Sequence, residues 1–164
     1  IRSKVARFCN VEIEDVISSL DAKTIYEVPL LMKEEGLDLR VIEKLGLETK
    51  EPDLTTWTNF VDAVINPPTE INIALVGKYV EHHDSYKSIV EAFIHAGAVN
   101  GCKVNIQWIQ SDNITEKNVA KKLKGVSGIL VAPGFGGRGI EGKLSAVKYA
   151  REQNIPFFGI CLGM

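Results

Sequence analysis

The feature that most constrains the fold is a regular alternation of apolar runs and helical patterns from residue 71 onward. The apolar runs, each of strand length, are 71–76, 104–108, 128–132 and 155–158. The helical patterns between them cover 86–97, 115–123 and 141–153. Strands that alternate with helices at this spacing predict an α/β fold, with a parallel sheet and helices on both of its faces. Sheets of this kind bind ligands at the carboxyl ends of their strands.

The first 70 residues follow a different pattern. The apolar run 5–9 predicts a strand, whereas short helices are expected over 29–36 and 38–45. The proline at position 29 suits the first turn of a helix, and glycines end both helical segments. A third helix is expected over 57–65 and stops at an Asn-Pro-Pro sequence. This part of the chain therefore predicts short elements ahead of the regular alternation.

These patterns divide the chain into an N-terminal part, 1–46, a linker, 47–70, and the α/β part, 71–164. The 164 residues suit one domain together with a piece of another. The chain starts at Ile1, which is not an initiator methionine and does not begin a signal peptide. We expect both ends to be excised from a longer protein.

Composition excludes several classes of protein. The net charge is -2 and there is no basic stripe, which argues against nucleic-acid binding. The three cysteines, Cys9, Cys102 and Cys161, have no CxxC spacing, which argues against a disulfide framework or a zinc site. No apolar run approaches the roughly 20 residues that span a bilayer. We therefore expect a protein of the reducing cytoplasm, with no membrane partner.

The segment 159–164 carries the clearest chemical signal. It follows an apolar strand and reads G-x-C-x-G, the cysteine form of the nucleophile elbow. In such an elbow the thiol of Cys161 stands at the carboxyl edge of the sheet, near the start of a helix whose dipole favours the thiolate. Cys161 is therefore the candidate nucleophile, whereas Cys9 and Cys102 are expected to be inert packing residues.

A glycine-rich loop, 134–139, follows the third predicted strand and matches G-x-G-x-x-G. A dinucleotide site also needs an acidic residue at the end of the next strand, but that strand ends at Cys161. The same region resembles a phosphate-binding loop in part, yet Leu144 stands where a magnesium-binding Ser or Thr is required. Both of these interpretations are weak.

An oxyanion hole fits the loop better. Acyl transfer at Cys161 creates a tetrahedral oxyanion that needs two preorganised donors. The backbone N–H of Leu162 is one candidate, and that of Gly134 is the other because Pro133 has no N–H. The three histidines are expected to be structural or solvated rather than to act as the general base; they are His82, His83 and His95.

Several segments together resemble a single family. They are 4–11, 19–29, 76–81, 84–88, 135–142 and 159–164. The last four resemble the opening, the F-G-x-R-G-x-E-G loop and the elbow of the glutaminase domain of the CTP synthases. The first two are similar to the tail of the synthetase domain of that family, and they make the resemblance specific. CTP synthases are glutamine-dependent ligases of pyrimidine biosynthesis.

The resemblance implies a class I glutamine amidotransferase fold, a flavodoxin-like half, preceded by a partial α/β synthetase tail over 1–46. It implies that glutamine is hydrolysed at Cys161 and that ammonia passes to UTP phosphorylated by ATP, which gives CTP. The residues implied are Gly134, Phe135, Leu162, Gly163 and Met164 for glutamine and the oxyanion, Lys4 for UTP or CTP, Leu20, Asp21 and Ala22 for ATP, and Arg138 and Glu141 for activation by GTP.

The resemblance also implies magnesium with its ligands outside this chain, and a homotetramer when the protein is full length. The glutaminase His and Glu of the family are missing from the sequence, so the chain on its own is predicted to be inactive. One alternative stays open at this point. It is a non-catalytic nucleotide-binding module built on the glycine-rich loop, with Cys161 merely buried.

Overall fold

The computed structural model describes residues 1–164 and divides into two compact units, Ile1–Asn66 and Pro67–Met164. The division falls inside the segment 47–70 that the sequence suggests as a linker. Residues 47–54 of this segment form neither helix nor strand. No helix in either unit combines the length and the apolar character needed to cross a membrane.

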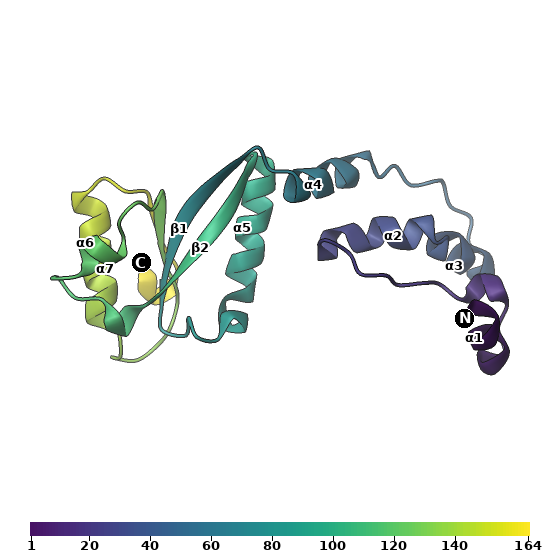
Figure 1. Cartoon of the computed structure of the whole chain (residues 1–164), viewed down its shortest axis with the longest axis horizontal. Coiled ribbons are helices and arrows are strands. Elements are labelled where there is room, and N and C mark those ends of the chain that lie inside the picture. The colour runs from purple at the N-terminus through teal and green to yellow at the C-terminus, as the bar shows by residue number, and fades with distance from the viewer. The chain divides into compact units, whose positions relative to one another are not determined.

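The N-terminal unit is built from helices and short 3-10 turns. Its elements are α1 (Arg2–Cys9), η1 (Ile13–Asp15), η2 (Ile25–Glu27), α2 (Val28–Glu34), α3 (Leu37–Leu45) and α4 (Thr55–Ile65) (Figure 1). The strand predicted at 5–9 is wrong, because these residues belong to α1. An apolar run of this length does not distinguish a strand from a helix. With no strand in the unit to pair with, the segment satisfies its backbone hydrogen bonds within a helix.

The Tyr26 region and α4 are held together by an aromatic cluster. The indole N–H of Trp57 donates a hydrogen bond to the carbonyl oxygen of Tyr26 at 2.9 Å. The Tyr26 ring meets the Phe60 ring edge-on, with centroids 5.2 Å apart. Because Trp57 and Phe60 are three residues apart, they share one face of α4. The helical stripe expected over 57–65 therefore packs against η2.

The second unit contains a four-stranded parallel sheet, which confirms the predicted fold class. Its strands are β1 (Thr69–Gly77), β2 (Cys102–Gln110), β3 (Gly128–Val131) and β4 (Phe157–Gly159). They lie in the order β2-β1-β3-β4, as in flavodoxin-like sheets. The connections contain η3 (His83–Tyr86), α5 (Lys87–Val99), η4 (Ser111–Asn113), α6 (Val119–Lys122) and α7 (Ile140–Glu152), and η5 (Cys161–Gly163) follows β4. The helix expected over 115–123 is shorter than predicted.

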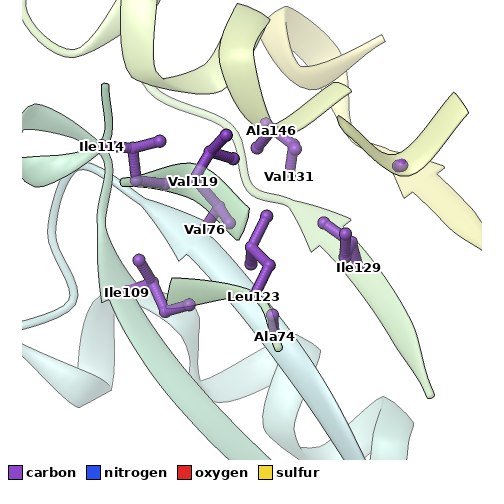
Figure 2. Close-up of a cluster of buried hydrophobic side chains, with 10 residues drawn as sticks. Ala74, Val76, Ile109, Ile114, Val119, Leu123, Ile129, Val131 and Ala146 are labelled. Atoms are coloured by element: carbon purple, nitrogen blue, oxygen red, sulfur yellow. The ribbon is translucent and has the colours of Figure 1, made fainter. Parts of the chain in front are cut away.

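Helices cover both faces of this sheet, with α6 and α7 on one side of the strands and α5 on the other (Figure 1). Alternate side chains of β1 supply the two cores, as strand geometry requires. Ala74 and Val76 join a cluster with Val119 of α6, with Leu123 just after that helix, and with Ala146 of α7 (Figure 2). Leu75 joins a second cluster, against which Ile89 and Phe93 of α5 pack.

The register of the sheet brings the glycine-rich loop and the elbow to the same place. β3 pairs with β4 so that Val131 lies opposite Gly159. β1 pairs with β3 so that Val76 also lies opposite Val131. The segments that follow these three strands therefore start side by side at the carboxyl edge of the sheet. This edge carries the candidate site.

Candidate active site

The backbone at Cys161 has the strained geometry of a nucleophile elbow. Its φ angle is 56°, in the left-handed region that residues other than glycine rarely adopt. The N–H of Ile160 still pairs with the carbonyl of Val131 at 3.1 Å, and the chain then turns through η5. The side chain of Cys161 is exposed. A buried cysteine, which the nucleotide-binding alternative requires, is therefore not observed.

Close packing explains the two glycines of the G-x-C-x-G pattern. A Cβ atom on Gly163 would collide with the carbonyl oxygen of Val131 at the end of β3. A Cβ atom on Gly159 would collide with the carbonyl oxygen of Gly163. The elbow can therefore fold back on the sheet only because both positions lack a side chain.

Two lysines hold carbonyl groups, one just before the glycine-rich loop and one within it. The ammonium of Lys143, near the start of α7, donates to the carbonyl oxygen of Ala132 at 2.8 Å. The ammonium of Lys78, just after β1, donates to the carbonyl oxygen of Phe135 at 2.7 Å. The loop between these carbonyls is therefore tied both to α7 and to the end of β1.

The hydroxyl of Tyr86 links the end of β1 to the same loop. It accepts the backbone N–H groups of Lys78 and Tyr79, each at 3.1 Å. It also lies 3.5 Å from the carbonyl oxygen of Pro133, to which it donates. Every peptide bond is trans, so the N–H of Gly134 points away from the Pro133 carbonyl and from Tyr86. Tyr86 therefore sets the direction of one candidate oxyanion donor.

The other residues assigned to glutamine lie around the elbow. Phe135 is 81% exposed and follows Gly134 directly. Leu162 and Met164 are exposed on the elbow itself, whereas Gly163 is buried against β3. The structure thus brings the predicted glutamine-binding residues to the ends of two neighbouring strands, β3 and β4.

Arg138 connects the glycine-rich loop to the end of β2. Its guanidinium forms an ion pair with Asp112 at 2.6 Å and donates to the carbonyl oxygen of Lys78 at 3.4 Å. The side-chain amide of Gln110 donates to the same two groups, each at 3.0 Å. Glu141 lies exposed in the first turn of α7. Arg138 and Glu141 therefore lie at the same edge of the sheet as Cys161.

The residues assigned to nucleotides by resemblance lie in the N-terminal unit. Lys4 is exposed on α1. Leu20, Asp21 and Ala22 lie between η1 and η2, in a segment that is neither helix nor strand. Their assignment to UTP, CTP and ATP stays a prediction.

One histidine has a defined partner away from the nucleophile. The ring of His83 stacks on Trp108, with centroids 4.2 Å apart and an angle of 11° between the planes. Trp108 belongs to β2, at the opposite edge of the sheet from β4. Three strand spacings of about 4.8 Å separate these strands, so His83 is out of hydrogen-bond reach of Cys161.

Sequence reasoning missed the role of Lys143, which is only 4% exposed. Burial, followed by the nearby charge of Lys78, lowers the pKa of Lys143, and attraction to the Cys161 thiolate acts in the opposite direction. The spacing of residues along the helix predicts that the Lys143 side chain is buried. Lys143 is three and seven residues before Ala146 and Ala150, two buried residues of α7, and therefore faces the sheet with them.

The structure offers no resident metal centre. No three side chains of the His, Cys, Asp or Glu type gather where they could hold an ion. The residues present therefore do not fit a magnesium site, and magnesium with ligands elsewhere stays a prediction. A hollow of about 590 Å³ also lies between α5 and the β4 edge. Its lining has no charged side chain, so it does not suit an amino acid or a nucleotide.

Comparison with known proteins agrees with this geometry. Residues 81–164 match the family model for glutamine amidotransferase class-I, and residues 1–47 match that for the CTP synthase N-terminus. The whole chain is 63% identical to a CTP synthase of Cytophaga hutchinsonii, 60% to one of Flavobacterium johnsoniae and 56% to one of Methanococcus maripaludis. The chain spans 31%, 31% and 32% of the length of these three relatives.

A solved structure supports the fold of the second unit. The chain is similar to the glutaminase domain of the Trypanosoma brucei CTPS with bound acivicin, with a TM-score of 0.53 and 38% sequence identity. The match covers 57% of this chain and 37% of that one. The chain therefore belongs to the class-I glutamine amidotransferase family and, by its sequence, to the CTP synthases.

Proposed function

We propose that this chain is part of an enzyme that hydrolyses glutamine at Cys161 and uses the ammonia for ATP-dependent conversion of UTP to CTP. The observation that carries the proposal is the exposed Cys161, held at a φ of 56° on a glycine-flanked elbow. A cysteine in this position is presented for attack on an acyl carbon. Membership of the CTP synthases supports glutamine as the acyl donor.

In the proposed reaction, the thiolate of Cys161 attacks the carboxamide carbon of glutamine and forms a tetrahedral oxyanion. The N–H groups of Gly134 and Leu162 stabilise the oxyanion by hydrogen bonds. Collapse of the intermediate breaks the C–N bond, and the nitrogen leaves as ammonia after it takes up a proton. Water then hydrolyses the thioester, which releases glutamate and restores the thiol.

The remaining assignments complete the proposed enzyme. ATP transfers its terminal phosphoryl group to an oxygen of UTP and leaves as ADP. Ammonia then displaces that oxygen as inorganic phosphate, and magnesium would be held by residues outside this chain. The match of 1–47 to the CTP synthase N-terminus supports Lys4 as a contact for UTP or CTP and 20–22 as a contact for ATP. Exposure at the site edge supports Arg138 and Glu141 as contacts for the activator GTP. We propose a cytoplasmic homotetramer for the complete protein.

The Cys161→Ala variant of the protein as its gene encodes it tests the proposal. We expect glutamine-dependent formation of CTP to fall by roughly a thousandfold or more, because the nucleophile is lost. Formation of CTP from free ammonia should stay at the wild-type rate, since that step does not use the thiol. Cys9→Ala, which removes another exposed thiol, is the matched control and should leave both rates unchanged.

Two results would overturn the assignment. Equal loss of both activities would make Cys161 a structural residue. Full retention of the glutamine-dependent rate would place the nucleophile elsewhere. The same glutaminase assay on the 164 residues expressed alone checks the further expectation that they are inactive without the His and Glu of the family.

A further inference from the structure

Lys143 occupies a position that is unfavourable for a cation. The side chain is 4% exposed, and transfer of an ammonium group from water into a protein costs free energy unless the charge is compensated. It also lies near the start of α7, where the helix dipole repels positive charge. Lys78 adds a like charge nearby. The partner that offsets these costs should therefore be an anion.

The one hydrogen bond seen for this ammonium does not supply such a charge. It goes to the carbonyl oxygen of Ala132, which is a neutral dipole. A lysine ammonium has three N–H donors, so two more are present. The ammonium also lies 3.8 Å from the place that a Cβ atom on Gly134 would occupy. It therefore lies close to Gly134, whose N–H is a candidate oxyanion donor.

Cys161 is the group that can supply the negative charge. Ala132 follows β3, Cys161 follows β4, and the two strands are neighbours in the sheet. Gly163, two residues after Cys161, packs against the carbonyl of Val131, and Lys143 binds the carbonyl of the next residue, Ala132, so the elbow and the ammonium meet at the end of the same strand. Attraction to the Cys161 thiolate acts to raise the pKa of Lys143, which agrees with this placement. A positive charge beside a cysteine stabilises the thiolate form by electrostatic attraction.

We propose that Lys143 is a positioning residue of the glutaminase site: its ammonium holds the Ala132 carbonyl and stabilises the thiolate of Cys161. This inference rests on the proposed function, which makes the thiolate the nucleophile. The thiolate, not the thiol, is the reactive form of cysteine. Lys143 thus favours the reactive form of Cys161 and holds the segment just before the glycine-rich loop in place, without touching the substrate.

Other charged groups lie on the elements around α7. Lys78 is occupied by the carbonyl oxygen of Phe135. Asp112 of η4 is neutralised by its ion pair with Arg138. Lys121 of α6 is exposed and Lys122 is half-buried, and both are cations. Glu141, in the first turn of α7 itself, is exposed to solvent. None of these groups provides a buried negative charge for Lys143, and Cys161 is the remaining group that can become an anion at this edge.

The pH dependence of alkylation at Cys161 tests the inference in the protein as its gene encodes it. Iodoacetamide, a neutral reagent, is used, and labelling is measured for each cysteine by peptide mass spectrometry. Lys143→Met keeps most of the side-chain length and removes the charge. We expect its profile at Cys161 to move to higher pH, with a rate at neutral pH about threefold to tenfold lower than in the wild type.

Three controls accompany this measurement. Cys9, exposed on α1, serves as an internal reference whose profile should not move. Lys148→Met removes an exposed charge from the same helix, where Lys148 pairs with Glu116, and should leave Cys161 unaffected. Lys143→Arg keeps the charge and should keep a profile close to that of the wild type. A merely structural role would not separate the Met and Arg variants in this way.

An unmoved profile in a folded Lys143→Met protein would overturn the inference, as would an equal movement in Lys148→Met. If Lys143→Met fails to fold, the comparison of Cys161 with Cys9 in the wild type is the test. The inference then requires that Cys161 is alkylated at lower pH than Cys9. A Cys161 profile at or above that of Cys9 would overturn the inference. Alkylation needs no glutamine, so its outcome is separate from the Cys161→Ala assay that decides the proposed function.

Discussion

At the scale of single residues, the elbow combines a strained cysteine with glycines that have no room for a side chain. The left-handed backbone at Cys161 is unfavourable for a residue with a Cβ atom. Hydrogen bonds from Gly163 to Ile160 at 2.9 Å and from Met164 to Cys161 at 3.1 Å hold the turn closed. Burial of Gly163 against Val131 locks the turn onto the sheet.

Gly163→Ala tests this packing directly. We expect it to lower the free energy of unfolding of the second unit by roughly 1–3 kcal/mol, because the new methyl group would occupy the space of the Val131 carbonyl oxygen. Urea denaturation in a Trp57→Phe background, where Trp108 is the remaining tryptophan, measures the loss by fluorescence. Gly137→Ala is the matched control, since a Cβ atom at Gly137 meets nothing within 4 Å. A Gly163→Ala protein as stable as the control would contradict the packing described for the elbow.

At the scale of elements, ion pairs join η1 to α3 in the N-terminal unit. Asp15 lies 2.6 Å from the guanidinium of Arg40 and 2.9 Å from the ammonium of Lys44. Arg40 also pairs with Glu12 at 2.6 Å. Hydrogen bonds from Lys44 and then from Arg40 lower the pKa of Asp15 from 3.8 to about 2. The Asp15 carboxylate is therefore the centre of the contact between these two elements.

This lowered pKa predicts an acid-sensitive N-terminal unit. The folded state binds a proton at Asp15 less readily than the unfolded state does, so the ion pairs contribute fully above about pH 4. Their contribution is lost as the pH falls from about 4 to about 2. Urea denaturation at a series of pH values in a Trp108→Phe background, where Trp57 is the remaining tryptophan, measures this dependence by fluorescence. In Asp15→Asn, the part of the pH dependence of stability that comes from the Asp15 carboxylate should disappear.

Glu14→Gln provides the control, because Glu14 is an exposed carboxylate in the same turn. Its removal should leave the loss of stability between pH 4 and pH 2 in place. If Asp15→Asn and Glu14→Gln behave alike, the acid sensitivity arises from overall charge and not from the contact between η1 and α3.

At the scale of the whole molecule, the two units differ in how much apolar surface they bury. In the N-terminal unit, Ala6 and Val61 are the hydrophobic residues that are fully buried. The second unit contains both core clusters of the chain. Since burial of apolar surface dominates stability, the second unit should be the more stable of the two.

Each unit contains one of the two tryptophans, which allows this difference to be measured. Trp108→Phe leaves Trp57 as the reporter of the N-terminal unit, and Trp57→Phe leaves Trp108 as the reporter of the second. We expect the Trp57 transition at a lower urea concentration than the Trp108 transition. Coincident transitions would show that the units unfold as one cooperative body.

Several features of this protein were determined by its sequence alone. The alternation after residue 71 predicted the parallel sheet, because the period of apolar residues identifies strands and helices locally and helical connections make neighbouring strands parallel. The spacing G-x-C-x-G predicted the elbow, because the turn depends on a few adjacent residues. The strand prediction for 5–9 was wrong because a run of this length suits either a strand or a helix. The unit contains no strand with which it could pair, and the segment forms α1.

The contacts that shape the site were decided by tertiary structure. Tyr86 meets Pro133 across 47 positions of the chain, and Arg138 meets Asp112 across 26. Such contacts depend on the strand order β2-β1-β3-β4, which no local pattern encodes. Burial of Lys143 likewise follows from the packing of α7 on β3 and not from the residue type, since lysine alone predicts a solvated side chain. Local periodicity therefore determined the elements, whereas their order in space determined which charges meet.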